Sequence, residues 1–166
     1  MIHSGHVIKL PDNVDTDIII PTQYMTLETI EEMVPYAFTP LRPDIPDKVR
    51  KGDILICGDN FGCGSSREQA PEIIKLLGFY CVIAKSFARI FYRNSVNNGL
   101  LVIENKKIYD RVKEGSKISI DLEMHQIQTY SGELIEFGDF PETVISIIDK
   151  GGLVNYYREM NMKDHS

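Results

Sequence analysis

Three short apolar runs, separated by two segments of helical period, dominate the middle of the chain. The apolar runs are residues 53–57, 80–84 and 100–103. Residues 67–77 and 87–96 lie between them with apolar side chains at helical spacing, and Gly78 is well suited to end the first of these helices. Consecutive strands can pair in parallel only through a crossover, which a helix of this length supplies. The pattern therefore predicts an α/β fold with parallel strands and crossover helices.

The regions on either side have different patterns. Residues 3–10 are typical of a first strand, and residues 18–20 continue it as far as Pro21. Near the C-terminus, apolar and polar residues alternate in three segments, which predicts a small antiparallel sheet from residues 117–122, 126–130 and 134–137. Helices are expected at residues 28–33, 141–149 and 153–162, with Pro141 as the first helical residue of the second. We expect residues 1–166 to form a single domain.

Four prolines follow one another closely between residues 35 and 46. Proline fixes its own backbone angle φ and has no N–H to donate, so it interrupts both helices and sheets. Residues 36–47 are therefore expected to form an extended, partly mobile connection.

Charge and hydropathy exclude several classes of protein. The net charge of −6 argues against nucleic acid as a partner, although a local arginine can still bind an acidic substrate. The apolar runs are too short to span a bilayer, and the first residues have no features of a secretion signal. The three cysteines, Cys57, Cys63 and Cys81, lack the spacing of a disulfide framework. Free thiols are typical of a reducing compartment, so we expect a cytoplasmic protein with no membrane segment.

The segment between the first apolar run and its helix is rich in glycine and serine. Residues 58–68 read GDNFGCGSSRE. Glycine allows tight turns and close approach of a ligand, and the start of the following helix offers free N–H groups and a positive dipole end. Arg67 adds a guanidinium suited to a carboxylate. These features favour an anion-binding site. The segment lacks the spacing of a dinucleotide-binding or Walker loop.

A purely structural interpretation of the same segment stays open. Ser65 and Glu68 match the Ser-x-x-Glu capping box, in which each side chain binds a backbone N–H at the start of a helix. In that case Arg67 contributes to stability and little else. A serine engaged as a cap is also less available for chemistry.

Three blocks of sequence together resemble the signature of the aconitase swivelling domain. They are DNVDTD at residues 12–17, NFGCGSSRE at residues 60–68 and IAKSFARIF at residues 83–91. Their order and spacing are similar to those in the small subunits of isopropylmalate dehydratase and homoaconitase, over nearly the whole chain. The resemblance implies a swivelling β/β/α domain. It also implies a hydro-lyase in which a large partner subunit carries a 4Fe–4S cluster and the substrate is a hydroxy-dicarboxylate or hydroxy-tricarboxylate.

The resemblance also implies roles for individual residues. Ser65 corresponds to the catalytic base, and Asp17 to an aspartate of the active site. Ser66 and Arg67, together with Gly64, correspond to residues that bind the substrate carboxylate. Serine is a weak base at neutral pH, so its alkoxide needs positive potential, which helix N–H groups and Arg67 can supply.

A loop shortly after the first block resembles the family segment that lies over the variable end of the substrate. The matching residues are Tyr24, Met25, Thr26 and Leu27. An arginine in the place of Thr26 resembles homoaconitase and aconitase, where it would pair with a third carboxylate. Because a buried carboxylate without a partner is costly, Thr26 and its apolar neighbours favour the aliphatic substituent of isopropylmalate. A dimethylmalate or citramalate substrate suits the same loop, and Thr26 is equally typical of a simple turn.

Other candidates remain beside this one. The same loop is also compatible with a stand-alone module that binds a carboxylate or phosphate. When isolated, the chain could form a homo-oligomer. Three cysteines could in principle hold an iron–sulfur cluster, but the runs around Cys57 and Cys81 indicate buried strands. We therefore assign no metal ligand to this chain. Three roles stay open for Arg89: it could contact the site, contact a partner, or form an ion pair on the surface of its own helix.

Overall fold

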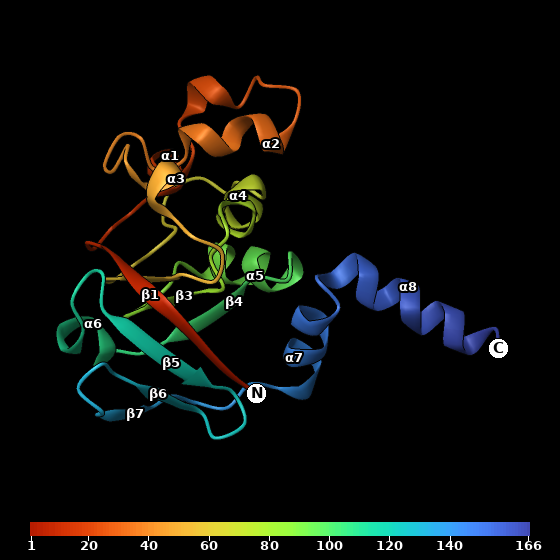
Figure 1. Ribbon diagram of the computed structural model, residues 1–166. Helices are drawn as coiled ribbons and strands as arrows, with labels where there is room; N and C mark the ends of the chain where they lie inside the picture. Colours follow the sequence, from red (N-terminus) through yellow and green to blue (C-terminus); the bar gives the residue numbers. More distant parts are fainter.

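A single sheet of seven strands organises the computed structural model, which describes residues 1–166 (Figure 1). The strand order is β4-β3-β2-β1-β5-β6-β7. The strands are β1 (Ile2–Leu10), β2 (Ile54–Cys57), β3 (Cys81–Ala84), β4 (Leu101–Glu104), β5 (Lys117–Asp121), β6 (Gln126–Gln128) and β7 (Leu134–Glu136). β1 through β4 pair in parallel, whereas β5, β6 and β7 pair in antiparallel fashion. The predicted α/β class is therefore confirmed.

The long strand β1 joins the two halves of this sheet. Its C-terminal residues 7–10 pair with β2, and its N-terminal residues 2–6 pair with β5. The antiparallel strands expected from the C-terminal pattern thus do not form a separate sheet, because β1 is long enough to offer a partner to each half.

The helices lie around this sheet and at one end of it. The α-helices are α1 (Thr16–Ile19), α2 (Ile30–Met33), α3 (Ile45–Lys48), α4 (Gln69–Leu77), α5 (Arg89–Asn97), α6 (Ile108–Arg111), α7 (Glu142–Asp149) and α8 (Leu153–Asp164), and single 3₁₀ turns are η1 (Thr22–Tyr24) and η2 (Val34–Tyr36). In Figure 1, α1, α2 and α3 gather at the end of the molecule where β1 finishes, and α8 leads away from the body. None of these helices is long and apolar enough to cross a membrane.

Each face of the sheet has its own apolar cluster. The larger cluster has 23 buried residues and includes Leu55 and Cys57 of β2, together with apolar side chains of α1, α4 and α5. The smaller cluster has 14 and includes Ile54 and Ile56 of the same strand. Successive side chains of a strand point to opposite faces, so the continuous apolar run of β2 is explained by burial on both sides.

The strand expected at residues 18–20 is wrong, because α1 occupies this place. The Asp15 carboxylate accepts a hydrogen bond from the Ile18 N–H at 2.9 Å and caps the helix, while the backbone of Asp15 accepts from Ile18 and Ile19. Ile19 and Ile20 are fully buried in the larger cluster. Local capping and burial therefore outweigh the strand preference of three consecutive isoleucines.

The extended connection expected at residues 36–47 is also wrong. The segment folds into consecutive turns that end in α3, with Phe38 and Ile45 fully buried. The Phe38 N–H donates to the Ile19 carbonyl at 3.1 Å, which ties the segment to the end of α1. The prolines are compatible with this path because they occupy turns and the first positions of short helices.

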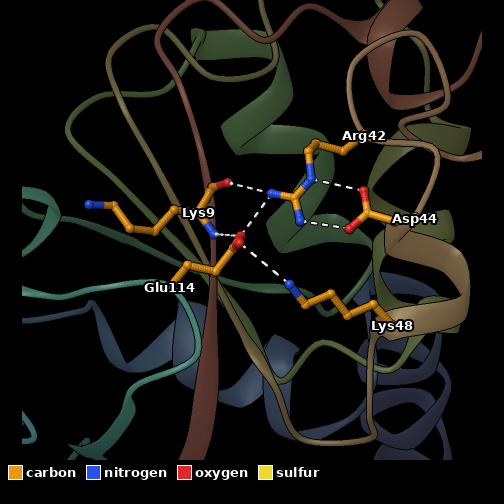
Figure 2. A network of polar contacts seen from close by, with 5 residues as sticks. All are labelled: Lys9, Arg42, Asp44, Lys48 and Glu114. Atoms are coloured by element: carbon orange, nitrogen blue, oxygen red, sulfur yellow. Dashed lines mark hydrogen bonds and ion pairs between the residues drawn. The ribbon is translucent and has the colours of Figure 1, made fainter.

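A network of ionic contacts fixes the same segment to the sheet (Figure 2). The guanidinium of Arg42 donates to both carboxylate oxygens of Asp44, at 2.9 and 2.8 Å, and to Glu114 at 2.8 Å. Glu114 also accepts from the backbone N–H of Lys9 in β1, at 3.2 Å, and pairs with Lys48 at 3.4 Å. The hydrogen bond from Arg42 lowers the pKa of Asp44 to about 2.

Candidate active site

The first and second sequence blocks lie side by side in the folded chain. The Gly62 N–H donates to the Val14 carbonyl at 2.8 Å, and the Thr16 N–H donates to the Cys63 carbonyl at 2.9 Å. The Thr16 hydroxyl donates to the Ser65 carbonyl at 2.8 Å. Loop 58–68 therefore runs along the start of α1, and Asp17 of α1 comes close to the Ser-Ser-Arg segment.

The third block packs against the same loop at the start of α5. The Phe61 N–H donates to the Ser86 carbonyl at 3.0 Å, and the Ala88 N–H donates to the Phe61 carbonyl at 2.9 Å. Gly62 has a φ of +81°, and a Cβ atom there would lie 2.2 Å from the ring of Phe91. Only glycine allows this contact, so the first turn of α5 is held against the loop.

Ser65 and Ser66 are exposed at the edge of this loop. The capping box that the sequence left open for Ser65 and Glu68 is absent. Helix α4 begins at Gln69, with Glu68 as its N-cap and no side-chain capping bond. Gly64 adopts a left-handed φ of +91°, and the Ser65 carbonyl is bound to Thr16, so the chain enters the helix only after Arg67. The Ser65 hydroxyl is therefore not engaged as a cap.

Arg67 is held by three groups near the end of α1. Its guanidinium forms an ion pair with Asp17, donates to the Ile20 carbonyl, and donates to the Thr22 hydroxyl at 2.9 Å. The Arg67 side chain is 12% exposed, whereas that of Asp17 is 59% exposed. Two hydrogen bonds and one ion pair thereby fix the orientation of the guanidinium.

A cleft of about 230 Å³ opens between the loop and the start of α5. Its lining comes from both sides: Thr16, Gly62, Gly64, Ser65, Ser66, Arg67, Ala88, Arg89, Ile90, Phe91 and Asn94. Three of the expected site residues with side-chain donors, Ser65, Ser66 and Arg67, thus share one cavity. Hydroxyls and guanidinium N–H groups are the donors that a carboxylate requires.

Arg89 and Asn94 of α5 line the cleft in addition to the site residues predicted from the sequence. The sequence left open whether Arg89 reaches the site, and the structure places it in the cleft with no ion pair to any residue of the chain. Asn94 was missed, because a lone asparagine on a helix carries no local signal. The position of Arg89 within the third block was the available indication.

Tyr24, Met25 and Thr26 do not line this cleft. They follow Thr22, whose hydroxyl binds Arg67. Tyr24 stacks on Tyr36 with ring centroids 4.0 Å apart, and Met25 packs against the larger apolar cluster. Thr26 is exposed, and its hydroxyl donates to the Gln23 carbonyl at 3.3 Å. The structure therefore connects this loop to the cleft only through the contact between Thr22 and Arg67.

The three cysteines do not converge. Cys57 belongs to the larger apolar cluster and Cys81 to the smaller one, so the two thiols face opposite sides of the sheet. Burial raises the pKa of both thiols. Cys63 lies in the loop, and partial burial followed by the charge of Asp15 raises its pKa too. No group of three or more His, Cys, Asp or Glu side chains is placed to hold a metal ion.

The chain is similar to known proteins both in sequence and in structure. Residues 12–108 match the family model of the aconitase C-terminal domain. The chain is 53% identical over 161 residues to the 3-isopropylmalate dehydratase small subunit of Lachnospira eligens, covering 97% of each chain. It is 46% identical to the methanogen homoaconitase small subunit of Methanothermobacter thermautotrophicus, covering 92% of this chain and 89% of that one. The crystal structure of 3-isopropylmalate dehydratase (leuD) from Methanocaldococcus jannaschii superposes with a TM-score of 0.93 at 40% identity, over 99% and 98% of the two chains.

Proposed function

The chain belongs to the family of the aconitase C-terminal domain, and on this basis we propose that it is the small subunit of a 3-isopropylmalate dehydratase. The proposed reaction interconverts 2-isopropylmalate and 3-isopropylmalate by removing water and adding it back, a step of leucine biosynthesis. Residues 1–166 would act as one swivelling domain in the cytoplasm, where free thiols stay reduced. The observation that carries the proposal is the gathering of Ser65, Ser66 and Arg67 in one cleft.

Ser65 is the proposed base. Dehydration of a malate requires loss of a proton next to a carboxylate, so the base must reach the substrate carbon directly. The Ser65 hydroxyl is exposed in the cleft and is not used as a helix cap, which removes the competition that the sequence suggested. The neighbouring guanidinium of Arg67 lowers the cost of the alkoxide.

Ser66 and Arg67 are proposed to bind a carboxylate of the substrate, with Gly64 allowing its close approach. The contacts of Arg67 with Asp17, Ile20 and Thr22 favour one orientation of the guanidinium before the substrate arrives. Such preorganisation reduces the entropy lost on binding. Asp17 is thus proposed to act by orienting Arg67 rather than by exchanging a proton with the substrate.

The loop with Tyr24, Met25 and Thr26 is proposed to set the choice of substrate. Its link to Arg67 through Thr22 would place it beside the variable arm of a substrate held in the cleft. A neutral Thr26 leaves a third carboxylate without a partner, which disfavours homocitrate. Malates with other aliphatic groups, such as dimethylmalate and citramalate, remain the closest competitors.

The cluster that the family requires is proposed to lie on a large partner subunit. The thiols of Cys57 and Cys81 face opposite sides of the sheet, so they cannot join Cys63 as one ligand set. In the complex a 4Fe–4S cluster supplies a Lewis acid for the departing hydroxyl of the substrate. The part of this chain is to bind the carboxylate and to hold the base next to the carbon that loses its proton.

Reconstitution tests the proposal. The chain is mixed with its cognate large subunit loaded with the cluster, and the absorbance of the alkene intermediate is followed with 3-isopropylmalate, homocitrate, dimethylmalate and citramalate. We expect turnover only when both subunits are present, and the highest kcat/KM for isopropylmalate. A higher kcat/KM for another acid would contradict the substrate, and saturable ligand binding by the chain alone without turnover in the complex would instead favour a stand-alone binding module.

A further inference from the structure

The charge balance of the cleft points to a role for Arg89. Arg67 and Arg89 are the two charged residues that line the cleft. Arg67 is paired with Asp17, so this pair contributes little net charge. A dicarboxylate that enters the cleft therefore finds one uncompensated positive charge on this chain, that of Arg89.

The fold holds the start of α5 in place, which positions Arg89. The hydrogen bond from the Ala88 N–H to the Phe61 carbonyl fixes the residue directly before it. The edge-to-face packing of the Phe61 and Phe91 rings, with centroids 5.2 Å apart, and the close approach of Gly62 to Phe91 hold the first turn of the helix against the loop. An exposed arginine on such an anchored backbone is suited to a ligand rather than to the core.

We propose that Arg89 binds the second carboxylate of the substrate, opposite the carboxylate bound by Ser66 and Arg67. This inference rests on the proposed function, since it assumes a dicarboxylate in the cleft. Both carboxylates are present before and after dehydration, so the contact stabilises the bound substrate and the transition state about equally. Its loss is therefore expected to raise KM much more than it lowers kcat.

The matched control is Arg93, which lies on the same helix, is exposed, and does not line the cleft. Arg89→Gln and Arg93→Gln remove the same charge from the same helix. Arg89→Lys keeps the charge but loses the planar fork that binds a carboxylate through two hydrogen bonds. The three variants thus separate a specific contact from a general effect of charge.

The experiment measures KM and kcat of the reconstituted complex at saturating large subunit, and separately the affinity of each variant for that subunit. We expect Arg89→Gln to raise KM about 10- to 100-fold, as for loss of a charged hydrogen bond, Arg89→Lys to recover part of it, and Arg93→Gln to match the wild type. An unchanged KM for Arg89→Gln overturns the proposal. The proposal is also overturned if Arg89→Gln binds the large subunit more weakly but has a normal KM once that subunit is saturating. That result would mean that Arg89 contacts a carboxylate of the partner.

A failure of the proposed function would look different. If the wild-type complex turns over homocitrate or citramalate instead of isopropylmalate, the same comparison is made with that acid. The role of Arg89 is then judged by whether Arg89→Gln raises KM for that acid. The identity of the substrate is judged separately, from the kcat/KM values of the wild-type complex.

Discussion

The guanidinium of Arg67 is paired with the carboxylate of Asp17, and this contact joins the glycine-serine loop to α1. Thr22 and the Ile20 carbonyl complete the support of the same guanidinium. A carboxylate bound at this site, as proposed, would therefore meet an arginine that is already oriented.

The first prediction concerns Asp17. Asp17→Asn is expected to lower kcat/KM of the complex about tenfold or more, because the guanidinium loses its ionic support. The Asp17 side chain is 59% exposed, so the free energy of unfolding should change by less than about 1 kcal/mol. Asp47→Asn, at an exposed aspartate of α3, is the control for charge. A large loss of stability with unchanged kinetics would assign Asp17 a structural role instead.

The second prediction tests the contact between the loop and α5. A Cβ at Gly62 would lie 2.2 Å from the Phe91 ring, at a φ of +81°. Gly62→Ala is therefore expected to cost about 2–4 kcal/mol of unfolding free energy from overpacking and backbone strain. Gly115 has a similar φ of +82° but no atom near its Cβ position, so Gly115→Ala should cost only about 1–2 kcal/mol. If Gly62→Ala and Gly115→Ala lose the same unfolding free energy in urea, the close packing of Gly62 against Phe91 is contradicted.

The third prediction addresses the substrate loop. Thr26→Arg places a cation on the exposed turn that follows Thr22, whose hydroxyl binds Arg67. We expect the ratio of kcat/KM for homocitrate over isopropylmalate to rise about tenfold or more, since a charged hydrogen bond then satisfies the third carboxylate. Thr26→Lys would test whether a positive charge at this position, without the guanidinium geometry, is enough to raise the same ratio. An unchanged ratio would show that the loop does not reach the substrate in the complex.

The fourth prediction is a pH dependence of stability. The hydrogen bond from Arg42 lowers the pKa of Asp44 from 3.8 to about 2. The pKa of Glu114 is also lowered: burial opposes this, but hydrogen bonds from Arg42 and the Lys9 N–H outweigh it. As the pH falls below about 4, the unfolded chain takes up protons that the folded chain refuses, so stability decreases.

Arg42→Met tests this network. In urea unfolding between pH 6 and pH 2, the wild type should lose more stability than the variant, because the variant lacks the ion pairs that depress both pKa values. The two proteins should therefore differ most at pH 6 and converge near pH 2. Arg50→Met, at an exposed arginine without an ion pair, should follow the wild type. Parallel curves for wild type and Arg42→Met would contradict the role of the network.

The parallel core could be predicted from the sequence because burial on both faces makes each strand a continuous apolar run. The runs around Cys57 and Cys81 correspond to β2 and β3, and Gly78 ends α4 with a left-handed φ of +110°. These signals are local, since periodicity and a glycine at the end of a helix need no distant partner.

The errors concern places where a side-chain cap, core burial or a distant contact decides the local structure. Residues 18–20 form part of a helix and its end because Asp15 caps it and the core accepts Ile19 and Ile20. Ser65 does not cap α4 because its carbonyl is bound by Thr16, a contact between separate blocks. Nor could the sequence show that Arg89 enters the cleft, since this depends on how α5 packs against Gly62.

The rate of Ser65→Ala in the reconstituted complex tests the central claim most directly. We expect kcat for 3-isopropylmalate to fall about 10²- to 10⁴-fold, as for loss of a catalytic base, while the free energy of unfolding changes by less than about 0.5 kcal/mol. Thr29→Ala, which removes a true capping box at α2, should show the reverse pattern: a loss of about 1 kcal/mol and an unchanged kcat. A Ser65→Ala complex that retains the wild-type kcat would contradict the account.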